Sequence, residues 1–126
     1  MRDKAQRKLL CVKSIKIKNI PKKERDATKM EVDLLRRLHH PNIVRYIDSF
    51  LTRDRDKLCI VMEYCDGGDL AAQIKAARRT MFSESKILHW FVQIALGVHY
   101  MHTNNVLHRD LKTQNIFMTG NGRLVL

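Results

Sequence analysis

The spacing of apolar residues changes along the chain, and each spacing predicts a different element. From Leu9 to Lys18 apolar residues recur at alternate positions, which predicts a strand. From Ser83 to His102 they recur every three or four residues, which predicts a long helix with Ser83 as its N-cap. We expect the apolar stripe of this helix to be core; it consists of Ile87, Phe91, Ile94, Val98 and Met101.

Further patterns complete a mixed fold. Segments 43–51 and 57–65 are apolar and flank the polar "TRDRD", which predicts antiparallel strands. A shorter helix should begin after Asp69 as N-cap, and Asn121-Gly122 indicates a hairpin. Because most strands precede most helices, the sequence predicts an α+β fold in two parts joined near 63–68.

A helical pattern also follows "NIPKK". Its apolar face should contain Ala27, Glu31, Leu34, Leu35 and Leu38. Glu31 is a charged member of this face, and Lys13 is a charged member of the apolar face of the first strand. A buried unpaired charge is costly, so we expect Lys13 and Glu31 to form a partly buried ion pair. Either long side chain alone could instead reach solvent.

Composition limits the class of protein. A chain of 126 residues with 44% hydrophobic content can build one core, and it has no run of eighteen apolar residues and no signal-peptide pattern. We therefore expect an intracellular soluble protein without a membrane segment. Cys11, Cys59 and Cys65 show no metal-ligand spacing, so they are interpreted as buried free thiols.

The net charge of +11 raises the possibility of a nucleic-acid partner. However, the basic residues are dispersed, and the densest patch alternates with isoleucines and lacks aromatic residues for base stacking. A solvated charged face is the better interpretation, and no specific nucleic acid is expected.

The stretch from His108 to Asn115, "HRDLKTQN", fits the catalytic-loop pattern H-R-D-L-x-x-x-N at every specified position. At average residue usage, a chance match in a chain of this length is rarer than about one in ten thousand. It gathers groups able to bind metal, phosphate and a proton.

The chain resembles a eukaryotic protein kinase domain, and it is especially similar to the NIMA-related (Nek) Ser/Thr kinases. The resemblance runs from 9 to 126 and includes "LCVKSI", "KMEVDLLRRLHHPNIV", "LCIVMEYCDGGDL", "HWFVQIALGVHYMH" and "LHRDLKTQNIF". It implies an incomplete two-lobe fold: a partial N-lobe sheet with its helix at about 1–62, a hinge at 63–68, and the start of a helical C-lobe at 69–126.

The resemblance implies roles for the charged residues. Lys13 would hold the α- and β-phosphates of ATP, with Glu31 fixing Lys13. Asp110 would orient the substrate hydroxyl and accept its proton, Lys112 would neutralise charge on the transferring phosphoryl group, and Asn115 would hold Mg²⁺. In this family, a Lys two residues after the Asp, followed here by Thr113, marks Ser/Thr specificity.

The resemblance also implies an adenine site. Cys11 and Phe117 would lie above and below the ring, with Met62 at the back, and main-chain groups of Glu63 and Cys65 would bind its edge. Cys11 departs from the usual Ala. Met62 and Phe117 would also suit a plain core. Arg109 corresponds to an arginine that binds a phosphorylated activation loop in related kinases.

No G-x-G-x-x-G precedes Lys13, and the sequence stops before a D-F-G, so we expect residues 1–126 alone to lack appreciable kinase activity. The primary interpretation is a protein Ser/Thr kinase, or a fragment of one, using ATP and Mg²⁺ on protein substrates. One alternative is a non-catalytic truncated kinase that acts as a binding module. A basic nucleic-acid-binding protein is the less favoured alternative. The family suggests a cytoplasmic location with cytoskeletal or centrosomal association, and the sequence leaves the oligomeric state open.

Overall fold

The structure is a computed structural model that describes residues 9–78 and 80–126. The described chain divides into two compact units. The first unit contains the described residues up to His39 together with Arg45–Tyr64, and the second contains His40–Val44 and Cys65–Leu126. The predicted first part, about 1–62, therefore includes a short segment that folds with the second unit.

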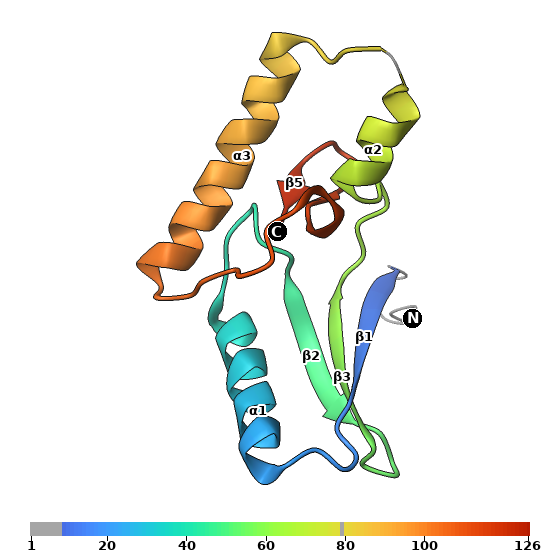
Figure 1. Ribbon diagram of the computed structural model, residues 1–126, viewed down its shortest axis with the longest axis vertical. Helices are drawn as coiled ribbons and strands as arrows, with labels where there is room; N and C mark the ends of the chain where they lie inside the picture. The colour runs from blue at the N-terminus through green and yellow to red at the C-terminus, as the bar shows by residue number, and fades with distance from the viewer. Residues whose placement is uncertain (1–8, 79) are drawn as a thin grey trace. The chain divides into compact units, whose positions relative to one another are not determined.

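The described residues of the first unit form a three-stranded antiparallel sheet beside one helix (Figure 1). Its elements are β1 (Leu10–Lys16), α1 (Lys22–Arg37), β2 (Tyr46–Leu51) and β3 (Lys57–Glu63), and β3 is the central strand. The strands expected from alternating and continuous apolar runs are confirmed. β2 begins three residues later than the apolar run because residues 42–44 bond to the second unit's C-terminal segment.

Helix α1 packs on the sheet through Val32, which is buried and clusters with Leu58 and Ile60 of β3. The predicted face of α1 is partly right, because Leu38 is buried and Leu35 packs against this cluster. Its other members are not buried, since Ala27 and Glu31 are exposed and Leu34 is 40% exposed. Turning Val32 inward gives the sheet an apolar partner and leaves the Glu31 carboxylate in water, which avoids the cost of burying an unpaired charge.

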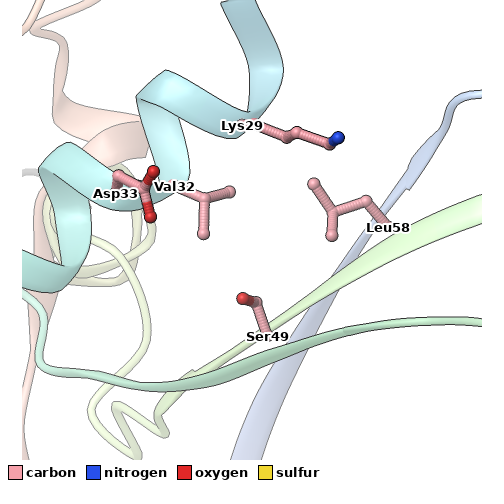
Figure 2. A pocket seen from close by; sticks show the side chains of 5 residues that line it. All are labelled: Lys29, Val32, Asp33, Ser49 and Leu58. Carbon is pink, nitrogen blue, oxygen red and sulfur yellow. The ribbon is translucent and has the colours of Figure 1, made fainter. Parts of the chain in front are cut away.

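The contact between α1 and the sheet is not tightly filled. An open pocket of about 210 Å³ lies between them, and Figure 2 shows α1 side chains on one side of it and strand side chains on the other. Its lining residues are Lys29, Val32, Asp33, Ser49 and Leu58. Incomplete packing of this kind forfeits dispersion contacts and leaves space beside the helix.

The second unit contains α2 (Leu70–Ala77), α3 (Glu84–Thr103), the short 3₁₀ helix η1 (Thr113–Asn115) and the pair β4 (Phe117–Met118) and β5 (Leu124–Val125). The predicted N-caps are confirmed, since Asp69 accepts from the Ala72 N–H at 2.7 Å and Ser83 accepts from the Lys86 N–H at 3.3 Å. Asn121-Gly122 lies in the turn between β4 and β5, as expected.

The core of the second unit contains Leu70, Trp90, Ile116 and Leu124. The stripe expected on α3 is therefore only partly right. Met101 is buried, but Ile87 is 50% exposed and Phe91 is 65% exposed. The buried positions of α3 are Trp90, Gln93, Gly97 and Met101. This face was missed because it contains a glutamine and a glycine, which a search for apolar spacing passes over.

The cysteines also differ from expectation. Only Cys59 is buried; Cys65 is intermediate and Cys11 is exposed on β1, and all are free thiols. Among residues 9–78 and 80–126, no helix is long and apolar enough to cross a membrane. No group of at least three His, Cys, Asp or Glu side chains in these same ranges is placed to hold a metal ion.

Candidate active site

Strand register places part of the predicted nucleotide site on one sheet face. Cys11 pairs with Met62, and Lys13 pairs with Ile60. Directly paired residues share a face, and Ile60 and Met62 belong to the cluster that contacts α1. Lys13 therefore projects from the face that α1 covers, as its place in the alternating pattern predicts, and its side chain is exposed.

The expected ion pair between Lys13 and Glu31 is not formed. Within the described ranges, the ion pairs are Lys18–Asp56 at 2.8 Å and Lys112–Asp110 at 3.0 Å. Lys13 and Glu31 are both exposed. Water satisfies each charge separately, so an ion pair between them would add little stability in this arrangement.

The end of β3 carries the first predicted adenine-edge residue. The Glu63 N–H donates to the Arg45 carbonyl at 2.9 Å, a contact within the first unit. Cys65 belongs to the second unit. The segment after Cys65 is joined to β4, because the Gly67 N–H donates to the Met118 carbonyl and the Met118 N–H donates to the Gly68 carbonyl.

Gly67 is required by this close approach. A Cβ atom at position 67 would lie 2.8 Å from the Met118 carbonyl oxygen and 2.9 Å from the Met118 Cβ. A bridge between Asp69 and Phe117 continues the same contact. The predicted adenine residues Cys65 and Phe117 therefore come from two strips of chain that are joined by backbone hydrogen bonds.

The predicted catalytic residues meet in one polar cluster. The Lys112 Nζ lies 3.0 Å from the Asp110 Oδ1. Asn115 donates from Nδ2 to the Asp110 Oδ2 at 2.7 Å and to the Asp110 carbonyl at 2.9 Å. The Asp110 N–H donates to the His108 Nδ1 at 3.3 Å. Each oxygen of the Asp110 carboxylate thus has its own partner, which fixes the direction of the group.

These contacts also set the charge of Asp110. The hydrogen bond from Lys112, followed by that from Asn115, lowers the pKa of the Asp110 carboxyl below its ordinary value of 3.8. The carboxyl is therefore ionised at neutral pH and can accept a hydrogen bond from a hydroxyl group.

Backbone strain lies beside the cluster. Arg109 has a φ of 63°, a left-handed conformation that is uncommon for a residue other than glycine. Such strain persists where surrounding contacts hold it, and it is enriched at active sites. Sequence reasoning assigned Arg109 only a role toward a phosphate, and no residue pattern would have indicated this conformation.

The cluster suits a magnesium ion in part. Mg²⁺ prefers carboxylate and amide oxygens and usually keeps several waters. Because the Asn115 Nδ2 faces Asp110, its Oδ1 is the atom left to meet a metal. The donors of this cluster are compatible with Mg²⁺ but do not by themselves make a full coordination shell.

The described chain thus carries a strand lysine, a helix glutamate and an H-R-D-type loop. The whole chain, residues 1–126, matches the family profile described as protein kinase domain. The chain belongs to the protein kinase domain family, whose members generally use ATP and Mg²⁺.

Its relatives are Nek kinases. The chain is 48% identical to the serine/threonine-protein kinase Nek5 of Homo sapiens over 119 residues, which is 94% of this chain and 16% of that protein. It is 45% identical to Nek1 of Mus musculus over 115 residues, or 91% of this chain and 9% of that protein. The chain is 39% identical to Nek6 of Oryza sativa subsp. japonica over 123 residues, which is 98% of this chain and 23% of that protein. The chain thus spans less than a quarter of the length of these relatives.

Proposed function

We propose that the chain supplies the catalytic loop and the nucleotide-positioning lysine of a protein Ser/Thr kinase, which transfers the γ-phosphate of ATP to Ser and Thr hydroxyls. The observation that carries this proposal is the Asp110–Lys112–Asn115 cluster, in which an ionised carboxylate is held between a cation and an amide. The likeness to Nek Ser/Thr kinases supports the choice of substrate class.

The residues divide the work of phosphoryl transfer. When bound, Mg·ATP supplies the transferring group and the metal that neutralises its charge. Asp110 orients the substrate hydroxyl by accepting its hydrogen bond, and it takes the proton as the oxygen attacks. Because its pKa is lowered, Asp110 acts mainly by orientation and electrostatics. Lys112 places a positive charge beside the developing charge of the transition state.

The proposed function also gives a role to Lys13 and Glu31, which lie on the first unit. Phosphoryl transfer in this family needs the strand lysine to be paired with the helix glutamate. An open pocket lies beside α1, and α1 lies on the face from which Lys13 projects. We infer that the Lys13–Glu31 pair forms when nucleotide phosphates draw Lys13 into place.

A segment exchange tests the proposed function. Residues 9–126 would replace the matching segment of the human Nek5 kinase, and phosphate transfer from ATP to a basic Ser/Thr-containing protein would be measured. The exchanged kinase should be active, and Asp110→Asn should reduce its rate by about a thousandfold or more. Asp54→Asn, which changes an exposed aspartate in a turn of the first unit, should leave the rate unchanged.

The contrary result is a folded exchanged kinase, checked by circular dichroism, whose phosphate transfer is absent. Equal rates for the parent and Asp110→Asn would also contradict the proposal.

A further inference from the structure

A buried polar network lies in the second unit, apart from the exposed catalytic cluster. Asn42 is 6% exposed and Gln93, in the middle of α3, is 9% exposed. Asn42 Nδ2 donates to the Gln93 Oε1 at 3.1 Å and to the Leu124 carbonyl at 2.8 Å. The Leu124 N–H donates to the same Gln93 Oε1 at 2.8 Å. We call these three residues the Asn42–Gln93 clamp.

The clamp joins segments that are far apart in the sequence. The Leu126 N–H donates to the Asn42 carbonyl at 3.0 Å, and the Val44 N–H donates to the Leu126 carbonyl at 2.9 Å. Helix α3 approaches closely at Gly97, where a Cβ atom would lie 2.9 Å from the Asn42 carbonyl oxygen. The end of the chain is thereby held against residues 40–44 and α3.

A short path runs from the clamp to the catalytic cluster. Leu124 pairs with Met118, and Val125 pairs with Phe117, so the clamp fixes β5 and β5 fixes β4. β4 begins two residues after Asn115, the residue whose amide holds Asp110. Leu124 and Val125 are each only 1% exposed, so β5 is closely packed on all sides.

The acceptor atom of Gln93 is the critical part of the clamp. Its Oε1 accepts both bonds, whereas its Nε2 is buried without a hydrogen-bond partner among the described residues. A buried donor that loses its acceptor carries a full desolvation cost. Removing Oε1 would leave two buried donors without an acceptor, one N–H of the Asn42 side chain and the Leu124 N–H. Changing Nε2 would break no hydrogen bond within the described ranges.

We propose that Asn42 and Gln93 are positioning residues for the loop from Asp110 to Asn115, acting through β5 and β4. Their importance for catalysis rests on the proposed function, but their effect on the loop does not. The same network could serve only to stabilise the core, and the experiment separates these roles.

The test compares two substitutions at one position in the 126-residue chain. Gln93→Met keeps the length of the side chain and removes the acceptor, whereas Gln93→Glu keeps an oxygen acceptor. Amide hydrogen exchange and the side-chain amide signals of Asn115 would be followed by ¹⁵N NMR, without nucleotide. In Gln93→Met, the Leu124 N–H and the amides of 115–118 should exchange about tenfold faster, and the Asn115 side-chain signals should shift.

Gln93→Glu, measured together with the parent at mildly acidic pH where burial keeps the new carboxyl protonated and uncharged, should keep the exchange and the Asn115 signals of the parent. The β1–β3 amides of the first unit should be unchanged in both variants. Faster exchange at Leu124 with unaltered Asn115 signals would overturn the proposal, as would equal effects of the Met and Glu substitutions. If Gln93→Met does not fold, Asn42→Ser provides the second test, because it shortens the donor and should displace the same signals. Amide exchange and the Asn115 signals are measured without nucleotide, so they do not depend on phosphate transfer. A failure of phosphate transfer would count against the proposed function and not against this positioning role.

Discussion

Asp110 shows how a few local contacts prepare an exposed residue for chemistry. Its side chain is 63% exposed, so burial does little to it. Hydrogen bonds from Lys112 and Asn115 instead set both its direction and its charge. The spacing of these residues within one loop is visible in the sequence, which is why the cluster could be predicted. The left-handed conformation of Arg109 could not, because it depends on the contacts around it.

We expect Lys112→Gln to raise the pKa of Asp110 toward 3.8, because Lys112 is the largest cause of its lowering. The Asp110 contribution to stability is present above pH 3.8 and is lost as the pH falls through the lower folded-state pKa, and the substitution should weaken it. Carboxyl ¹³C NMR would follow the titration. Asp54 is the internal control, since its pKa is lowered mainly by Thr52, and it should not change. If the pKa of Asp110 is the same in Lys112→Gln as in the parent, Lys112 is not the cause of its lowering.

Ser83 starts α3 through one hydrogen bond from the Lys86 N–H. Replacing it by alanine should lower the free energy of unfolding by about 1 kcal/mol, because an N–H at the helix start loses its acceptor. Urea unfolding followed by circular dichroism measures the change. Ser85→Ala, the same substitution two residues further on at an exposed position, should cost less than about 0.5 kcal/mol. Equal costs would show that Ser83 does not cap the helix.

At the scale of elements, the existence of helices and strands was easier to predict than the faces they bury. β1, β3, α1 and α3 lie where apolar spacing placed them. The buried faces of α1 and α3 were predicted only in part, since Leu35, Leu38 and Met101 pack inward as expected but other members of each face do not. On α1, Val32 rather than Leu34 meets the sheet, and on α3 the polar Gln93 is buried because Asn42 and Leu124 bond to it.

The face of α1 can be tested by paired truncation. Val32→Ala should lower the free energy of unfolding by about 2 kcal/mol, since it removes buried methyl groups and enlarges the pocket beside Leu58. Leu34→Ala, at a position 40% exposed, should cost about 1 kcal/mol or less. Denaturant unfolding of the two variants gives the comparison. A larger cost for Leu34→Ala would favour the face predicted from the sequence.

At the scale of the whole molecule, the sequence predicted the family, whereas the roles given to the site residues stay predictions and one expected ion pair is not formed. The H-R-D-L-x-x-x-N match was the strongest indication of the protein kinase family, and the family profile confirms that prediction. The Lys13–Glu31 ion pair was expected from two charges on apolar faces, yet both side chains lie in water. Asn42 and Gln93 were missed because their partners are distant in the sequence. A glutamine between apolar residues in "FVQIAL" was the one available signal.

We propose that this chain contacts the phosphates of ATP through Lys13 and Lys112. The most direct test is to treat the chain with an acyl-phosphate derivative of ATP and Mg²⁺, because the acyl group transfers to amines held beside the phosphates. Mass spectrometry would then locate the modified lysines. We predict modification of Lys13 and Lys112 that excess ATP suppresses, with exposed lysines such as Lys16 and Lys22 as internal controls. Modification spread evenly over the exposed lysines and insensitive to ATP would contradict this role of Lys13 and Lys112.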